Sequence, residues 1–384
     1  MMYLWILIAL CLITTTSCNS SEKEACVTGA YPPAKEDKIP WYVINLDQPP
    51  DQRWDTLTLA KTTEMKAMIG EIKRLASIIL NGSLIPLIDH DLAPLVDELP
   101  FPFGDEIKGI AKTSNIPLGE IVLYNIFYEI FTVCTSIVAR DENGKMFHAR
   151  NLDFGLFMGW DISNDTWALT ELLRPLVVNL NFQQNGMTVF KTVNFAGYIG
   201  VLSGIKPGVF TLTMNERFTV DGGYIGLLEW VLGKRSGHWM SFLTRNTLSN
   251  ADSFSEAVNM LANTEMLAPA YFILGGVAEG AVITRAIEKS LDIWRLSPTN
   301  DTWFLLETNY DHWKPAPVID DRRTPGINCM NHMGQQELSL AGLFNVLSTR
   351  PVLNKLTTYT ALMQVDEGYL ESYLRYCPDP CWPW

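Results

Sequence analysis

Cys134 is the residue of this sequence whose neighbours most favour chemistry. It opens the run 134–140, and after a polar turn the chain returns as 145–154, which carries Arg150 and Asp153. A thiol that meets a guanidinium and a carboxylate at one end of a hairpin is suited to nucleophilic catalysis. The alternative is an inert core cysteine, because free cysteines are among the most buried residues. A charged pair is costly to bury beside an inert thiol, which argues against that alternative.

The turn between these two runs decides which residue faces Cys134. Asn143-Gly144 between two alternating runs is the strongest short-range signal for a hairpin. If these two residues form the centre of the turn, Cys134 pairs with Asp153. If the turn is centred one residue earlier, Cys134 pairs with Asn151. Both registers predict that the thiol, the guanidinium and the carboxylate share one end of the hairpin.

Composition narrows the classes of function. The net charge of −13 and the pI near 4.9 argue against nucleic acid as a partner, because nucleic acid selects basic patches. Hydrophobic residues make up 47% of the chain, which is enough for a sizeable core. We find no HExxH, Gly-x-Ser-x-Gly or phosphate-loop motif, and therefore predict neither a metal nor another cofactor. The histidines stand in no motif: His90, His148, His238, His312 and His332.

The first 18 residues are typical of a secretory signal peptide. They form an apolar run that ends in small residues and is too short to span a membrane comfortably. Because the run lacks a preceding Lys or Arg, an uncleaved anchor is the alternative. We find no later segment that is apolar for long enough to span. In a secreted chain, sequons predict glycosylated surface loops at Asn81, Asn164 and Asn300.

Cysteine usage supports secretion. Two of the seven cysteines leave with the signal peptide, and one is the candidate nucleophile, so an even number remains for disulfides. Cys377 and Cys381 are near enough in sequence to close a small loop, which leaves Cys26 to pair with Cys329. Metal binding is the alternative for Cys377 and Cys381, although no His or Cys cluster completes a zinc site.

The apolar pattern changes at Cys134. Before it, helical spacing predicts a helix over 54–80 and, after a break at 116–119, an apolar helix that continues to Val133. After it, short apolar or alternating runs between turn residues predict mainly strands. The pattern alone indicates an α+β protein, and two sheets between helix layers would satisfy it.

Individual elements follow from the same signals. Ser253 and Glu256 form a capping box that starts a helix. The other predicted helices after Cys134 are 223–232, 239–248 and 338–347. The predicted strands are 187–195, 199–203, 210–214, 271–274, 281–285, 291–296, 303–308, 357–365 and 369–374.

Several motifs together resemble one enzyme family. The runs 134–139 and 150–154 look like the amidases of the acid ceramidase and N-acylethanolamine acid amidase family, which are N-terminal-nucleophile hydrolases. The C-terminal run 377–381 is similar to the acid ceramidase branch, whereas 309–317 is closer to the acylethanolamine branch. The resemblance extends from about Tyr31 to the last residue. Further matching runs are 215–217, 268–276, 308–311 and 320–325.

The resemblance implies a four-layer αββα fold and a precursor that is cut before its nucleophile. The cut would fall at Val133-Cys134, giving an α chain of residues 19–133 and a β chain of residues 134–384. A Cys26–Cys329 disulfide would then join the two chains as a heterodimer made from one precursor.

The resemblance also implies roles for the hairpin residues. After the cut, the α-amine of Cys134 is the nearest general base for its own thiol, so no catalytic histidine is needed. In an acidic compartment the pKa of that amine must be lowered, and the fixed charge of Arg150 would lower it. Asp153 would hold and orient the amine while opposing that shift.

Three later residues are assigned by the resemblance as well. Asn309 is a candidate oxyanion donor, with an ordinary loop asparagine as the alternative. Arg322 would lie behind the site and fix other groups; the alternative is a solvated charge cluster. Glu216 would assist precursor cleavage or hold Arg150, and a salt bridge of structural value only is the alternative.

The implied reaction is hydrolysis of an N-acyl lipid through a thioester on Cys134. The leading substrate is ceramide, cleaved to sphingosine and fatty acid; the nearest alternative is an N-acylethanolamine. An alternative of another class is a secreted lipid-binding protein without catalysis. The acyl chain needs an apolar groove, for which the region of Trp160, Phe182, Tyr198 and Ile199 is a candidate, with core packing as the alternative. The implied location is the lysosome, with secretion, and the implied partners are a lysosomal membrane surface or a saposin-like helper.

Overall fold

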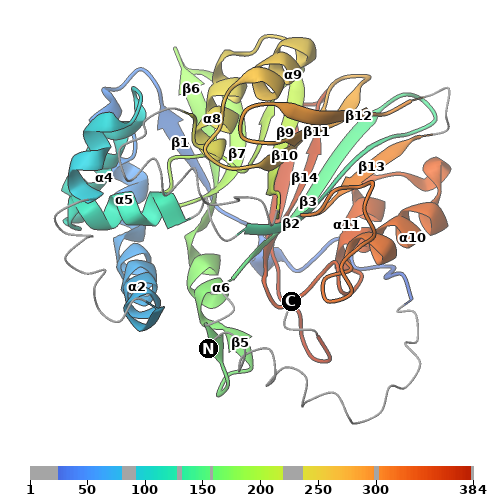
Figure 1. The fold of residues 1–384 in the computed structure, drawn as a ribbon, viewed down its shortest axis with the longest axis horizontal. Coiled ribbons are helices and arrows are strands. Elements are labelled where there is room, and N and C mark those ends of the chain that lie inside the picture. Colours follow the sequence, from blue (N-terminus) through green and yellow to red (C-terminus); the bar gives the residue numbers. More distant parts are fainter. Residues whose placement is uncertain are drawn as a thin grey trace.

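Two β-sheets packed face to face form the centre of the molecule. The computed structural model describes residues 25–79, 92–127, 132–155, 159–218, 237–297 and 302–381. Helices cover the outer face of each sheet (Figure 1). The predicted four-layer αββα architecture is therefore confirmed.

The larger sheet has eight strands in the order β1-β6-β7-β8-β9-β10-β11-β12. Its β1–β6 pair is parallel, and the following pairs are antiparallel. The strands are β1 (Trp41–Asn45), β6 (Val177–Gln184), β7 (Met187–Phe195), β8 (Ser203–Lys206), β9 (Phe210–Glu216), β10 (Ala270–Gly275), β11 (Gly280–Arg285) and β12 (Ser290–Arg295).

The smaller sheet has five antiparallel strands in the order β13-β2-β3-β14-β15. Its central hairpin, β2 and β3, carries the candidate nucleophile. The strands are β2 (Thr132–Arg140), β3 (Met146–Phe154), β13 (Phe304–Glu307), β14 (Thr357–Gln364) and β15 (Tyr369–Leu374). A separate two-stranded ribbon joins β4 (Trp160–Asp161) to β5 (Thr166–Trp167).

One pair of helices packs on each sheet. On the larger sheet, α8 (Met240–Asn250) contacts β7 to β9 and α9 (Phe254–Asn263) contacts β10 and β11. On the smaller sheet, α10 (Arg323–Met333) contacts β13 and α11 (Leu340–Ser348) contacts β3 and β14. The predicted cap is present, because Ser253 Oγ accepts from the Glu256 N–H at 3.1 Å. The Glu256 carboxylate bonds the N–H of Asp252 rather than that of the cap residue.

The N-terminal helices form a separate group beside β1, at the left of Figure 1. Two buried side chains attach this group to the loop after β7: Tyr124 Oη donates to Ala196 O at 2.8 Å, and Asn125 Nδ2 donates to Gly197 O at 3.1 Å. The group consists of α2 (Asp55–Ile79), α4 (Phe103–Ser114) and α5 (Leu118–Phe127). The remaining short helices are η1 (Lys35–Asp37), η2 (Pro50–Gln52), η4 (Ala93–Glu98), α6 (Ala168–Leu173), η5 (Arg174–Leu176) and η7 (Gln335–Glu337).

Two predicted elements are wrong at their ends. The helix expected to continue to Val133 is described only to Phe127, and Val133 lies in β2, where it pairs with Asp153. The strand expected over 199–203 begins only at Ser203. Before it, side chains bond the backbone of Tyr198, Ile199 and Gly200, and α8 bonds that of Val201; the neighbouring strand β9 bonds Leu202.

Those bonds explain the second error. Asn125 Oδ1 accepts from the Ile199 N–H at 2.9 Å, and Asn194 Nδ2 donates to the carbonyls of Tyr198 and Gly200 at 3.0 Å each. An apolar run whose backbone groups are satisfied in this way has no need of a sheet partner. The helix predicted over 223–232 and the signal peptide over 1–18 lie outside the described residues. Within the described ranges, none of the helices is both long and apolar enough to cross a bilayer.

Candidate active site

The β2–β3 hairpin pairs Cys134 with Leu152. Neither of the two predicted registers, with Asp153 or Asn151 opposite Cys134, is correct. The observed register lies between them, so each prediction was one residue away.

The turn accounts for the difference. Asp141 N–H donates to Lys145 O at 3.0 Å, which closes a three-residue loop rather than a two-residue one. Only the glycine of this loop, Gly144, has a positive φ, of 89°. A two-residue Asn-Gly turn of type I′ needs positive φ at both central residues, whereas a three-residue loop needs it only at the last. The extra residue shifts the whole ladder by one position.

This register separates the three reactive groups between two faces of the sheet. Cross-strand partners share a face, and neighbours along a strand alternate. Cys134 and Leu152 form one pair and Ser136 and Arg150 the next pair on the same face, so the thiol and the guanidinium both point toward the larger sheet. Asp153 points to the opposite face. Both faces are closed, because Cys134, Arg150 and Asp153 are each 0% exposed.

Arg150 directs one end of its guanidinium at the nucleophile. Its Nη2 donates to Cys134 Sγ and to Met214 O, the latter at 3.2 Å. Its Nη1 donates to Leu202 O at 2.6 Å and to Ser203 Oγ at 2.9 Å. The acceptors other than the thiol belong to the larger sheet or the loop leading into it. Arg150 therefore links the nucleophile to the facing sheet.

Arg322 lies on the other side of the same peptide, immediately before α10. Its Nη1 donates to Cys134 O at 2.6 Å and reaches Asp153 Oδ2 at 3.4 Å. Its Nη2 donates to Asn309 Oδ1 at 2.8 Å, and Asp320 holds the guanidinium from behind. Arg322 thus contacts the nucleophile's backbone and two other candidate residues, as a positioning role requires.

Asn309 contacts the bond that we expect to be cut. Its Oδ1 accepts from the Cys134 N–H at 2.8 Å, and its Nδ2 donates to the backbone carbonyl of Glu216 at 2.7 Å. In the intact chain the amide therefore holds the scissile nitrogen. Glu216 ends β9 and contacts Asn309 through its backbone carbonyl. The predicted contact between Glu216 and Arg150 is not among the four hydrogen bonds that the Arg150 guanidinium donates.

Asp153 is held by two residues that sequence reasoning missed. Thr357 Oγ1 donates to its Oδ1 at 2.6 Å, and Asn354 Nδ2 donates to its Oδ2 at 3.1 Å. The two partners form a turn, in which the Asn354 N–H donates to Thr357 Oγ1 and the Thr357 N–H donates to Asn354 O. An Asn three residues before a Thr at a strand start was the available signal, because such residues favour side-chain turns.

Burial dominates the titration of the site. It raises the pKa of the Cys134 thiol to about 11; Arg150 and Arg322 lower that pKa, and Asp153 raises it further. Burial also raises the pKa of Asp153 to about 6, against the lowering influence of Arg322 and of the two hydrogen bonds it accepts. The thiol is therefore protonated in the intact chain at acidic pH, and it needs a base before it can attack.

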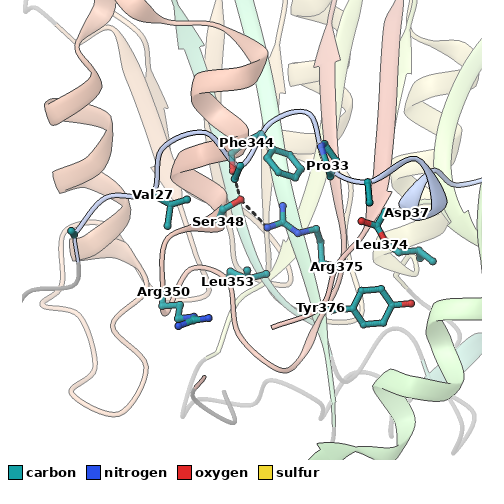
Figure 2. A pocket seen from close by; sticks show the side chains of 13 residues that line it. Val27, Pro33, Asp37, Phe344, Ser348, Arg350, Leu353, Leu374, Arg375 and Tyr376 are labelled. Atoms are coloured by element: carbon teal, nitrogen blue, oxygen red, sulfur yellow. Dashed lines mark hydrogen bonds between the residues drawn. The ribbon is translucent and has the colours of Figure 1, made fainter. Parts of the chain in front are cut away.

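The cavity drawn in Figure 2 lies away from these residues. It has a volume of about 580 Å³ and lies between the N-terminal segment and the end of β15, lined by Val27, Asp37, Arg350 and Arg375 among others (Figure 2). None of the candidate catalytic residues lines it.

The proposed acyl groove is mostly core. Phe182, Tyr198 and Ile199 are fully buried in the main apolar cluster, and the ring of Trp160 packs edge-on against Trp167. Core packing, the alternative considered above, accounts for the first three.

The cysteines pair as expected. Cys26 bonds Cys329 and Cys377 bonds Cys381, which removes the latter pair as metal ligands. Cys134 is the free cysteine of the described residues. In those same ranges no cluster of His, Cys, Asp or Glu side chains is arranged to hold a metal ion.

One of the three predicted glycosylation sites lies within the described residues. Asn164 is exposed in the turn between β4 and β5. Asn81 and Asn300 lie outside the described residues.

Curated relatives match almost the whole chain. Human acid ceramidase is 51% identical over 367 residues, which cover 94% of this chain and 93% of that protein. Mouse acid ceramidase is 49% identical over the same length and the same shares of both chains. The chain belongs to the acid ceramidase family.

Two family models and a solved structure agree with the acid ceramidase family. The model of linear amide C–N hydrolases of the choloylglycine hydrolase family matches residues 134–325, and the model of the beta subunit of N-acylethanolamine-hydrolyzing acid amidase matches residues 37–99. The structure of a Caenorhabditis elegans N-acylethanolamine-hydrolyzing acid amidase ortholog is 31% identical, with a TM-score of 0.54, and covers 63% of this chain and 100% of that chain. This member of the acid ceramidase family is therefore a linear amide hydrolase with an N-terminal-nucleophile fold.

Proposed function

We propose that this protein hydrolyses ceramide to sphingosine and a fatty acid, with Cys134 as the nucleophile. The observation that carries the proposal is the free Cys134 thiol in contact with a buried guanidinium. The match to the linear amide hydrolases begins at this same residue, which supports Cys134 as the first residue of the mature catalytic chain. The identity to acid ceramidases supports the choice of ceramide.

The precursor is cut at Val133-Cys134. The products are an α chain of residues 19–133 and a β chain of residues 134–384, joined by the Cys26–Cys329 disulfide. Two features support this cut. The bond lies inside β2, where Asn309 Oδ1 holds its nitrogen and Arg322 the following carbonyl.

The reaction then proceeds in two steps. The α-amine of Cys134 takes the thiol proton, and the thiolate attacks the amide carbonyl of the lipid. The C–N bond breaks, the leaving sphingosine nitrogen takes that proton, and a thioester remains. A water molecule, deprotonated by the same amine, attacks the thioester; the fatty acid leaves and the thiol is restored.

The surrounding residues have separate roles in these steps. Arg150 lowers the pKa of the thiol and the amine by its fixed positive charge, and Asp153 orients the amine. Asn309, whose contact with the scissile nitrogen ends when the bond is cut, donates to the developing oxyanion. Arg322 positions Asn309 and Asp153. Glu216, next to Asn309, assists the cleavage of the precursor.

The enzyme works in the lysosome and is also secreted. The apolar N-terminus, the two disulfides and the exposed sequon at Asn164 support passage through the secretory pathway. Its lipid substrate would reach it at a lysosomal membrane surface or on a saposin-like lipid-presenting protein. Glycans at Asn81 and Asn300 would accompany the one at Asn164.

The first experiment is the intact mass of the secreted protein, measured after acid incubation and reduction. We expect two chains, one beginning at Cys134, and a single uncut chain for Cys134→Ala. A Cys377→Ser/Cys381→Ser variant is the matched control, because it removes two sulfurs without touching the nucleophile, and it should still be cut. A wild-type protein that remains one chain would overturn the mechanism and favour a lipid-binding protein without catalysis.

Substrate choice needs a second experiment. N-acylethanolamines undergo the same chemistry, and 309–317 is closer to that branch, so the catalytic residues do not separate the two substrates. Rates on ceramide and on an N-acylethanolamine with the same acyl chain, at equal micellar concentration, would decide. Faster hydrolysis of the N-acylethanolamine would replace the proposed substrate but leave the mechanism intact.

A further inference from the structure

Tyr359 shares a row with the nucleophile in the smaller sheet. Leu152 of β3 pairs with Cys134 of β2 on one side and with Tyr359 of β14 on the other. Residues paired across neighbouring strands project from the same face, so Tyr359 also points toward the larger sheet. Its side chain is fully buried, and its ring packs against Phe195 at 6.0 Å between centroids.

The Tyr359 hydroxyl makes a bond between the two sheets at the active site. It lies 2.8 Å from Ser203 Oγ, at the start of β8 in the larger sheet. The same Ser203 oxygen accepts from Arg150 Nη1 at 2.9 Å, and the other end of that guanidinium contacts the thiol. A continuous chain of polar contacts therefore runs from Tyr359 through Ser203 and Arg150 to Cys134.

We propose that Tyr359 and Ser203 are positioning residues that hold Arg150 against the nucleophile. The inference deepens the proposed function and rests on it, because it needs Cys134 to be the reacting residue. Neither residue has been assigned a role in the mechanism above.

The planar shape of the guanidinium explains why a distant hydroxyl matters. Besides the thiol, Arg150 donates to two backbone carbonyls, Leu202 O and Met214 O, and to one side chain, Ser203. The carbonyls are fixed by the larger sheet, so they fix Arg150 relative to that sheet only. Tyr359 belongs to the sheet that carries the thiol, and its bond to Ser203 fixes the position of this acceptor relative to the nucleophile.

A change in the position of Arg150 would be measurable as a change in titration. The charged groups that act on Cys134 are Arg150 and Arg322, which lower its pKa, and Asp153, which raises it. Arg322 and Asp153 are held by other residues, Arg322 by Asp320 and Asp153 by Thr357 and Asn354. Loss of alignment at Arg150 would therefore weaken one lowering influence and shift the acid limb of kcat/KM to higher pH.

The test compares Ser203→Ala, Tyr359→Phe and the double variant in the two-chain enzyme. Because Ser203 accepts from a charged donor, we expect its loss to reduce kcat about tenfold, with KM little changed. Tyr359→Phe keeps the ring and should reduce kcat by a smaller factor. If Tyr359 acts through Ser203, the double variant will be no slower than Ser203→Ala alone. Each active variant should shift the acid limb upward.

Controls separate this role from general destabilisation. Tyr124→Phe removes another buried tyrosine hydroxyl, bonded to Ala196 O, and should leave the pH profile unchanged. Ser203→Thr keeps a hydroxyl and should recover most of the activity; together with Tyr359→Phe, it carries the test if Ser203→Ala does not fold. The inference is overturned if both effects multiply in the double variant, or if no variant shifts the acid limb. A wild-type enzyme without ceramide hydrolysis would instead contradict the proposed function.

Discussion

The molecule contains two buried charge clusters, one that crosses the proposed cut and one that lies wholly after it, and they are built differently. In the first, Glu106 of α4 is 0% exposed and accepts from the guanidinium of Arg245 at both oxygens, from Arg53 at 3.1 Å and from the Trp54 indole at 2.9 Å. Every donor is aimed at one carboxylate. Glu106, Arg53 and Trp54 lie before residue 134, and Arg245 lies after it.

The second cluster surrounds Cys134. Among the described residues, the guanidinium of Arg150 bonds backbone carbonyls, a serine and the thiol rather than a carboxylate. Asp153 receives its two shortest hydrogen bonds from neutral groups, Thr357 and Asn354. Because the charge of Arg150 is held but not neutralised, it keeps an electrostatic field at the nucleophile. Charges that saturate one another, as in the first cluster, only join two segments. Removing a charge should therefore cost stability in the first cluster and reactivity in the second.

The largest expected effect is on stability, from Glu106→Gln. The variant leaves the buried guanidinium of Arg245 facing a neutral amide, and breaking a buried ion pair in this way costs about 3–5 kcal/mol. We expect a clearly lower apparent melting temperature at a fixed scan rate, with kcat per folded molecule unchanged. A melting temperature equal to that of the wild type would show that the two clusters do not differ as described.

The same conservative substitution in both clusters separates their roles. Arg150→Lys keeps the charge but cannot contact the thiol, two carbonyls and a serine at once, so we expect kcat/KM to fall about 100-fold. Arg245→Lys should lower the melting temperature and leave kcat/KM nearly unchanged. Kinetics and thermal unfolding of the two variants would be measured side by side. Comparable activity losses in both would contradict the comparison.

A smaller effect concerns the pH dependence of the thiol. Asp153 has a pKa of about 6, and its carboxylate raises the pKa of Cys134. Below pH 5 Asp153 is already neutral, so Asp153→Asn should change little there; above pH 6 the variant removes a negative charge and the thiol should react faster. We expect a rate of alkylation several-fold above wild type at pH 7 and near-equal rates at pH 5. Asp366→Asn, at an exposed carboxylate, is the control.

The smallest effect uses a third buried carboxylate. Glu307 accepts the N–H of its neighbour Thr308 at 3.0 Å, and burial raises its pKa to about 8. Because the native state holds this proton more tightly, stability from Glu307 is full below its ordinary pKa of 4.5 and is lost as the pH rises through 8. His148 has the opposite effect on the pH dependence of stability, since burial lowers its pKa from 6.5 to about 3. The stability that His148 contributes is lost as the pH falls and is already complete above pH 7.

Of these two groups, therefore, Glu307 is the one whose contribution to stability changes between pH 7 and 8. Glu307→Gln should flatten the fall in stability over this range, with a gain on the order of 1 kcal/mol at pH 8. The measurement is apparent melting temperature against pH, with the exposed Glu288→Gln as control. A slope unchanged from that of the wild type would show that Glu307 is ionised in the native state without cost.

Local pattern predicted most of this fold. Met187–Phe195 and Tyr369–Leu374 are strands at the predicted bounds, and Ser253 caps a helix, because these signals act between residues close in sequence. Strand 199–203 and the helix end at Val133 were wrong because distant side chains and a sheet partner decided them.

At the site, sequence by itself determined which residues were available. Cys134, Arg150 and Asp153 could be named because a hairpin brings near neighbours together, and the later residues were named through family resemblance. Only the tertiary structure decided the register, through one extra loop residue, and so the face on which each group lies. Contacts such as those of Asn354 with Asp153 and of Tyr359 with Ser203 join residues 201 and 156 positions apart. No local preference encodes such pairs, because they arise only when the whole chain has packed.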